Sequence, residues 1–146
     1  MKTFLFFLII SILWCFSGFA QAVTTEPDRP IGDEEVTSII DLKKAKNPLA
    51  KGLLGKTSDV YLWAGVGPVL MGDPFKIKPA GQKDFYAPYP KGAMKFLGDD
   101  KWSITLIPRI YFSVPDSLNI KTMGIVVKSG DGKAQTENFY RRIYAK

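Results

Sequence analysis

The stretches of this chain that suit regular structure are short, and residues that favour turns separate them. The clearest stretch is 59–66, where Val60 and Leu62 would share one face of a strand and Trp63 the other. Similar stretches occur at 36–42, 94–97, 101–106, 120–128 and 137–144. No helical period longer than two turns is present, and single helical turns are expected only near 48–50 and 109–114. Six or seven short strands in a chain of this size predict an all-β fold, an immunoglobulin-like β-sandwich.

Residues 1–22 have the pattern of a secretory signal peptide. Lys2 precedes the apolar run 4–16, and small residues follow, so that cleavage could occur after Ala20 or after Ala22. The run is too short to span the ~30 Å of a bilayer core comfortably, and we expect no transmembrane segment once the signal is removed. The sequence therefore predicts export.

The polar segment 23–33 holds two prolines and a glycine, and its composition predicts a flexible tether before a sandwich over 34–146. Cys15 is the only cysteine. Bulky Trp14 before it is unlike a lipoprotein signal, so we expect Cys15 to leave with the signal peptide. Export without disulfides favours a secreted or periplasmic, cell-envelope protein of a bacterium.

The chemistry available to the mature chain is narrow. It has no histidine and no cysteine, which excludes an imidazole base, a thiolate nucleophile and the usual zinc ligands. A carboxylate pair is the remaining catalytic option. Its best candidates, Asp99 and Asp100, have the character of a hairpin turn between 94–97 and 101–106. We therefore predict a protein that is not an enzyme, with no catalytic residues, no cofactor and no metal site.

The charge pattern does not favour nucleic acid. The whole chain carries a formal net charge of +6, of which Lys2 contributes one. The basic residues are scattered rather than gathered in a run, as expected for a solubilising surface.

Aromatic residues are the remaining candidates for function. Residues 67–93 interleave five prolines and four glycines with aromatic side chains, which predicts a long structured loop. Trp102 alternates in phase with Ile104 and Leu106, which favours the core, whereas Trp63 is out of phase with Val60 and is balanced between core and ligand contact. Because flat aromatic faces stack on sugar rings, the candidate ligand-binding residues are Trp63, Tyr61, Tyr86, Trp102 and Lys128.

Four motifs occur in order at 58–66 (SDVYLWAGV), 94–102 (MKFLGDDKW), 111–115 (YFSVP) and 125–132 (IVVKSGDG). Together they resemble the immunoglobulin-like (E-set) accessory domains of exported Bacteroidetes polysaccharide-utilisation proteins. These domains include modules beside α-amylase catalytic domains and those of Sus-type starch-binding proteins. The resemblance covers roughly 34–146 and implies a non-catalytic sandwich that handles glycans, with a starch-like α-glucan as the first expectation.

Some domains of this kind act only as spacers. The alternative expectation is therefore a structural or protein-interaction domain of a cell-envelope or polysaccharide-utilisation complex, with no glycan ligand. A large exposed apolar patch without polar neighbours would favour this alternative. A glycan site should instead show an exposed aromatic side chain ringed by hydrogen-bonding groups.

Overall fold

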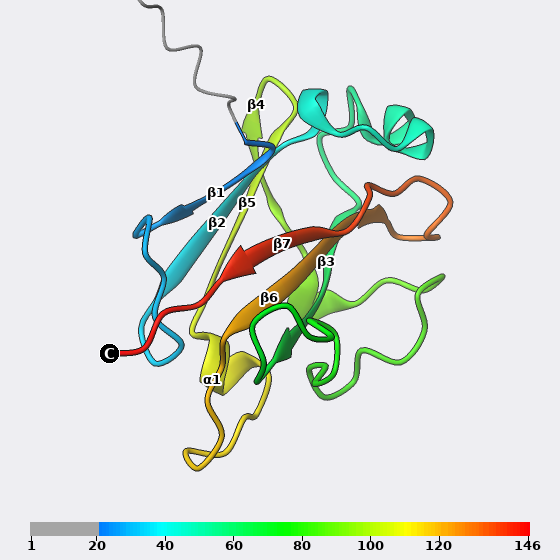
Figure 1. Ribbon diagram of the computed structural model, residues 1–146. Coiled ribbons are helices and arrows are strands. Elements are labelled where there is room, and N and C mark those ends of the chain that lie inside the picture. The colour runs from blue at the N-terminus through cyan, green and yellow to red at the C-terminus, as the bar shows by residue number, and fades with distance from the viewer. Residues whose placement is uncertain (1–20) are drawn as a thin grey trace, which may run out of the picture.

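The computed structural model describes residues 21–146, and the predicted signal peptide up to Ala20, with Cys15, lies outside this part. The described chain forms seven strands in two antiparallel sheets, which confirms the predicted all-β sandwich (Figure 1). One sheet contains β1 (Val23–Glu26), β2 (Val36–Asp41), β5 (Lys101–Leu106) and β4 (Lys95–Gly98). The other contains β3 (Val60–Gly67), β6 (Thr122–Ser129) and β7 (Phe139–Arg142).

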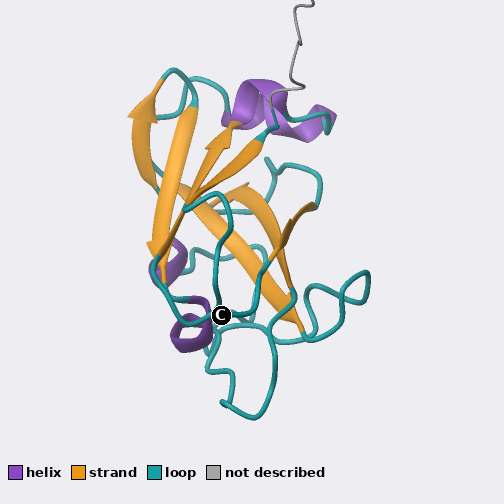
Figure 2. Ribbon diagram, turned by 60° about the vertical axis from the view of Figure 1, so that its left-hand side comes forward, coloured by secondary structure: helices purple, strands orange, loops and turns teal. Residues whose placement is uncertain are grey.

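The strand order is that of an immunoglobulin domain. The larger sheet runs β1-β2-β5-β4 and the smaller one β3-β6-β7, which matches the ABED and CFG sheets of the constant-type domain. Figure 2 shows the helical turns near the ends of the strands. The topology confirms the immunoglobulin-like architecture predicted from the spacing of the strands.

The core lies between the two sheets: burial alternates along β1, β2 and the first half of β3, whereas β6 is buried along its whole length. On β3, Val60, Leu62 and Ala64 are buried against β6 and the opposite sheet. Trp102 on β5 is 1% exposed and packs on Phe96, with ring centroids 5.0 Å apart. Trp102 is therefore a core residue, and its assignment as a ligand contact was wrong. Its phase with the neighbouring apolar residues already favoured this outcome.

Four helical turns connect the strands: η1 (Leu42–Lys44), η2 (Pro48–Leu53), η3 (Pro90–Gly92) and α1 (Pro108–Tyr111). At the start of η2 the Asn47 side chain accepts a hydrogen bond from Leu49 N, and Pro48 occupies the first helical position, where its missing N–H costs nothing. The turns expected near 48–50 and 109–114 are confirmed. Within residues 21–146, no helix has the length and apolar character needed to cross a bilayer.

The segment 23–33 is part of the sandwich, so the prediction of a flexible tether was wrong. β1 pairs with β2 along its whole length, and its alternate residues Val23 and Thr25 are buried. Further along, Pro30 O accepts a hydrogen bond from Tyr144 N. The polar composition concealed a short strand, because only every second residue of an edge strand needs to be buried.

The β4–β5 hairpin closes through Asp99 and Asp100, which both have positive φ (52° and 56°), as a two-residue type I′ turn requires. Asp100 accepts a hydrogen bond from Gly55 N at 2.7 Å, and Asp99 forms an ion pair with Lys43. The two carboxylates therefore serve the turn and its neighbours, as the sequence predicted.

The long 67–93 segment lies along the free edge of β3. Val66 and Ile77 exchange both backbone hydrogen bonds, at 2.9 and 3.0 Å. At Ala64, two residues before Val66 on β3, the side-chain amide of buried Gln82 takes the place of a strand partner. Its oxygen accepts from Ala64 N (3.1 Å) and its nitrogen donates to Ala64 O (2.8 Å). This covering fixes the path of the loop beside the outer face of the smaller sheet.

Candidate functional site

The outer face of the smaller sheet carries the half-buried aromatic residues Tyr61 and Trp63. They alternate with the core residues of β3, as predicted, and Trp63 lies directly opposite Val126 of β6. A hollow of about 170 Å³ opens beside the Trp63 ring. Its lining consists of Trp63, Phe75, Lys78, Phe85, Val126, Gln135 and Asn138. We call it the Trp63 hollow.

Phe75 forms one wall of the hollow because two glycines leave room for it. Gly65 and Gly124 face each other across β3 and β6. A Cβ atom on Gly124 would lie 2.6 Å from the Phe75 ring, and one on Gly65 would lie 2.5 Å from Phe75 Cα, both closer than real contacts allow. The missing side chains therefore let the loop lie flat on the sheet.

Phe85 forms the opposite wall. Its ring meets Trp63 edge-to-face, with centroids 5.2 Å apart and planes 75° apart, a favourable aromatic geometry. Gly132 in the β6–β7 turn lies beneath it with φ +68°, and a Cβ there would lie 2.8 Å from Phe85 O. The position of this wall thus depends on the turn after β6 as well as on its own loop.

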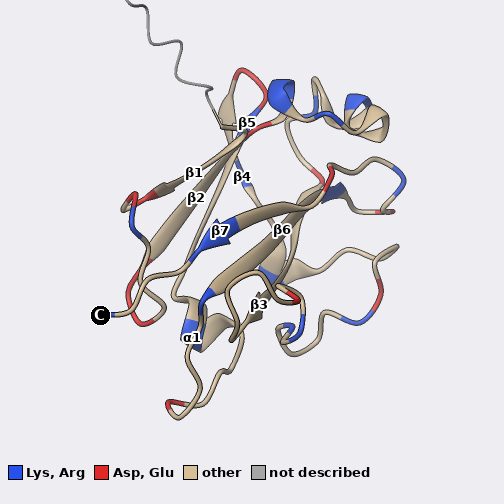
Figure 3. Cartoon of the chain, viewed as in Figure 1, with Lys and Arg blue, Asp and Glu red and all other residues tan. Residues whose placement is uncertain are grey.

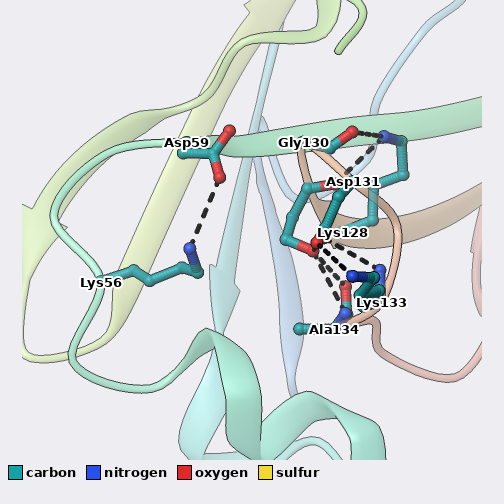
Figure 4. Close-up of polar contacts among 8 residues, drawn as sticks. Lys56, Asp59, Lys128, Gly130, Asp131, Lys133 and Ala134 are labelled. Carbon is teal, nitrogen blue, oxygen red and sulfur yellow. Dashed lines mark hydrogen bonds and ion pairs between the residues drawn. The ribbon is translucent and has the colours of Figure 1, made fainter. Parts of the chain in front are cut away.

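Lys128 anchors that loop from below, as a fully buried residue (0% exposed). Its Nζ donates to the carbonyl oxygens of Ala87 (3.0 Å), Ser129 (3.1 Å) and Gly130 (3.3 Å). It also lies 5.5 Å from the Tyr61 ring centroid and 5.4 Å from that of Phe85. Figure 4 shows the Lys128 side chain directed back to the carbonyl of Gly130.

The assignment of Lys128 as a ligand contact was wrong, because its ammonium is enclosed by backbone carbonyls and aromatic rings. Burial lowers the pKa of Lys128, and the carboxylates of Asp59, Asp131 and Asp84 oppose that effect. The residue positions Phe85 and contributes to the site only indirectly.

The turn between β6 and β7 orders the polar rim of the hollow. Asp131 accepts hydrogen bonds from the Ser129 hydroxyl (2.6 Å) and from Lys133 N (3.1 Å), and these bonds lower its pKa. Figure 4 shows Asp131 beside Lys133 in this turn. Gln135 follows, paired with Lys128 by an isolated bridge. The turn therefore holds Gln135 at the hollow.

Glu137 fixes the other polar residue, Asn138. Its carboxylate accepts hydrogen bonds from Lys46 N (2.8 and 3.0 Å) and from Asn47 N (3.1 Å). Burial alone would raise the pKa of Glu137, but these backbone donors outweigh burial and lower it. The lining of the hollow itself then contains amides and one ammonium, that of Lys78, which lies 5.7 Å from the Trp63 ring centroid.

Of the five residues predicted to bind a ligand, the hollow contains only Trp63. Tyr61 lies beside Lys128, and Tyr86 is 71% exposed and meets the ring of Phe85 edge-to-face with centroids 5.6 Å apart. The sequence prediction missed Phe75, Phe85, Lys78, Gln135 and Asn138. Gly65 and Gly124, within two predicted strands, were the available signal, because a glycine inside a strand indicates the close approach of another segment.

Within residues 21–146, no three histidine, cysteine, aspartate or glutamate side chains gather as metal ligands would. The chemistry of the hollow is that of stacking and neutral hydrogen bonding, with one cation at its edge. No family model matches the chain, and no curated protein matches it either.

Proposed function

We propose that this protein is an exported, non-catalytic domain that binds an oligosaccharide or polysaccharide at the Trp63 hollow. The observation that supports this function is the combination of three aromatic walls with hydrogen-bonding side chains on one rim. The apolar C–H face of a sugar ring stacks on an aromatic ring, and its hydroxyls require donors and acceptors at the edge. Trp63, Gln135 and Asn138 supply these two kinds of contact.

The size of the hollow fits weak binding to one unit of a chain. Its volume of about 170 Å³ is smaller than the sites that enclose a whole small-molecule ligand, so a single ring would sit in it while the neighbouring units lie outside. The resemblance to accessory domains of Bacteroidetes polysaccharide-utilisation proteins makes starch-like α-glucans the first ligands to test. We further propose that the protein acts in the periplasm or at the bacterial cell envelope.

Affinity electrophoresis through gels that contain soluble starch or other glycans tests this function. The parent protein should be retarded by at least one glycan, and Trp63→Ala should migrate freely. Ile110→Ala removes an exposed apolar side chain of α1 that is not part of the lining of the hollow, and it serves as the control. Circular dichroism should show that each variant is folded. Equal retardation of the parent and Trp63→Ala would exclude the hollow as the binding site.

A second candidate is a protein-interaction domain of an envelope complex. Leu70 and Met71 (95% exposed) lie beside Pro74 and Tyr140 in a mostly apolar hollow of about 430 Å³. Polar groups of Thr122 and two arginines border it, so it is not the purely apolar patch that would favour this function over glycan binding. If the protein is an interaction domain, Met71→Asp should abolish its co-purification with the envelope complex, and Trp63→Ala should not.

A further inference from the structure

A second groove adjoins the Trp63 hollow. It has a volume of about 540 Å³ and runs between the edge strands β1 and β7. Its lining consists of Gln21, Ala22, Val23, Lys44, Lys46, Glu137, Asn138, Phe139, Tyr140, Arg141 and Arg142. Asn138 lines both cavities, so a chain molecule bound at Trp63 can pass over Asn138 into this groove. We call it the β1–β7 groove.

The groove is basic. Lys44, Lys46, Arg141 and Arg142 contribute four cations to its lining, and Figure 3 shows basic residues at the end of β7. The only acidic residue in the lining is Glu137, whose carboxylate oxygens are already engaged by backbone N–H groups of the η1–η2 connection.

Two of the four cations already have partners within the fold. The Arg141 guanidinium donates to Gln21 Oε1 (3.0 Å), to Thr25 Oγ1 (2.8 Å) and to Asp28 O (3.1 Å). Lys44 forms an ion pair with Asp41 at 3.4 Å. Arg141 therefore joins β7 to the β1 side of the groove, and the charge of Lys44 is offset locally by Asp41.

The other two, Lys46 and Arg142, form no ion pair with any residue of 21–146, and neither does Lys78 at the Trp63 hollow. Arg142 packs on the Tyr144 ring, 4.9 Å from its centroid, a contact that steadies the guanidinium without neutralising it. The joined cavities thus present three cations outside any ion pair among residues 21–146, of which only Lys46 has a nearby carboxylate, that of Glu137, to offset part of its charge.

We infer that the ligand is an acidic polysaccharide, a chain of carboxylate-bearing sugar rings such as uronic acids. This inference rests on the proposed function. One ring would stack on Trp63 with its carboxylate near Lys78, and the following units would lie in the β1–β7 groove with their carboxylates at Lys46 and Arg142. A neutral glucan would gain only hydrogen bonds to its hydroxyls from these cations, whereas an acidic chain also gains complementary charge at both ends of the path.

The test compares polygalacturonate with its fully methyl-esterified form, which has the same backbone without the charge, and includes alginate, starch and dextran sulfate. The variants are Lys46→Gln with Arg142→Gln as a double variant, Trp63→Ala, and Lys51→Gln, an exposed lysine of η2 outside the groove lining, as the control. Affinity is measured by isothermal titration at low and at moderate salt.

The inference predicts that polygalacturonate or alginate binds at least about tenfold more tightly than the esterified polymer and starch. The double variant should lose about tenfold or more in affinity for the acidic chain, Trp63→Ala should lose binding as well, and Lys51→Gln should bind like the parent. Binding should weaken as salt rises, because exposed charges are screened.

Each contrary result identifies which idea fails. Starch or the esterified polymer could bind as tightly as polygalacturonate and lose that binding in Trp63→Ala. This result would overturn the acidic preference and leave the proposed function intact. The protein could instead bind dextran sulfate and polygalacturonate equally, with no effect of Trp63→Ala. This result would show a general polyanion-binding surface and would overturn both the acidic preference and the proposed function. Absence of binding to every glycan by folded protein would also overturn both.

Discussion

Replacing Gln82 with alanine tests whether the long loop is held to β3 as the structure shows. The Gln82 side chain is buried, and its amide makes both hydrogen bonds with the backbone of Ala64. Alanine at this position would leave one N–H and one C=O unsatisfied in a place where water has little access. An unsatisfied buried group costs ~1–3 kcal/mol, so the two together should lower the free energy of unfolding by ~2–6 kcal/mol.

Urea denaturation followed by tryptophan fluorescence measures this change. Lys83→Ala, at the exposed neighbouring position, is the matched control and should change the free energy of unfolding by less than ~0.5 kcal/mol. A loss below ~1 kcal/mol in Gln82→Ala would show that water or a shifted loop satisfies Ala64, and would refute the reasoning.

Gln82→Glu tests the direction of the two hydrogen bonds between this side chain and Ala64. An ionised glutamate accepts from Ala64 N but repels Ala64 O, whereas the protonated acid can donate to that oxygen. The folded state should therefore raise the pKa of this glutamate, and the stability from its protonated form should be present at low pH and lost as the pH rises. The deficit relative to the parent should be smaller at pH 4 than at pH 7; an equal deficit would contradict the hydrogen-bond pattern.

Three further predictions follow from single positions. Gly65→Ala should lower the free energy of unfolding by ~1–3 kcal/mol in urea denaturation, because its Cβ would strike the backbone of Phe75; an unchanged value would mean that the loop yields freely. Ser38→Ala should leave that free energy unchanged or raise it by up to ~1 kcal/mol, because the buried hydroxyl has no partner within residues 21–146, and a clear loss would reveal one. The pKa of Glu137 is lowered from 4.5, so its contribution is complete above about pH 4.5 and is lost as the pH falls through the lower folded value. Glu137→Gln should therefore reduce the dependence of the melting temperature on pH between 3 and 5, and curves that stay parallel would refute this role.

Strands β2 and β3 could be predicted because burial alternates along β2 and along the first half of β3. The two tryptophans illustrate this. Trp102 is in phase with apolar neighbours and lies in the core, whereas Trp63 is out of phase with Val60 and lies on the outer face of its sheet. β1 was missed because a four-residue edge strand in a polar segment has only two buried positions, Val23 and Thr25.

The candidate site was less predictable. Trp63 could be found on its strand, but Phe75 and Phe85 reach it through a loop whose path depends on contacts that have no local signature. Lys128 was misassigned for a similar reason. Its compensating carbonyls, from Ala87 and Gly130, belong to loops that meet only in the folded molecule, so a lysine in an apolar strand gave no sign of burial.

Arg141 connects β7 to β1 through Thr25, which lies 116 residues earlier in the chain. A polypeptide emerges from the ribosome with its N-terminus leading, so β1 is available long before β7 has been made. The first strand can pair with β2 early, but its contacts with the opposite layer must wait until β7 arrives. The two layers of the sandwich are therefore joined through Arg141 only late in synthesis, and a chain halted before Arg141 would leave its first strand open to other partners.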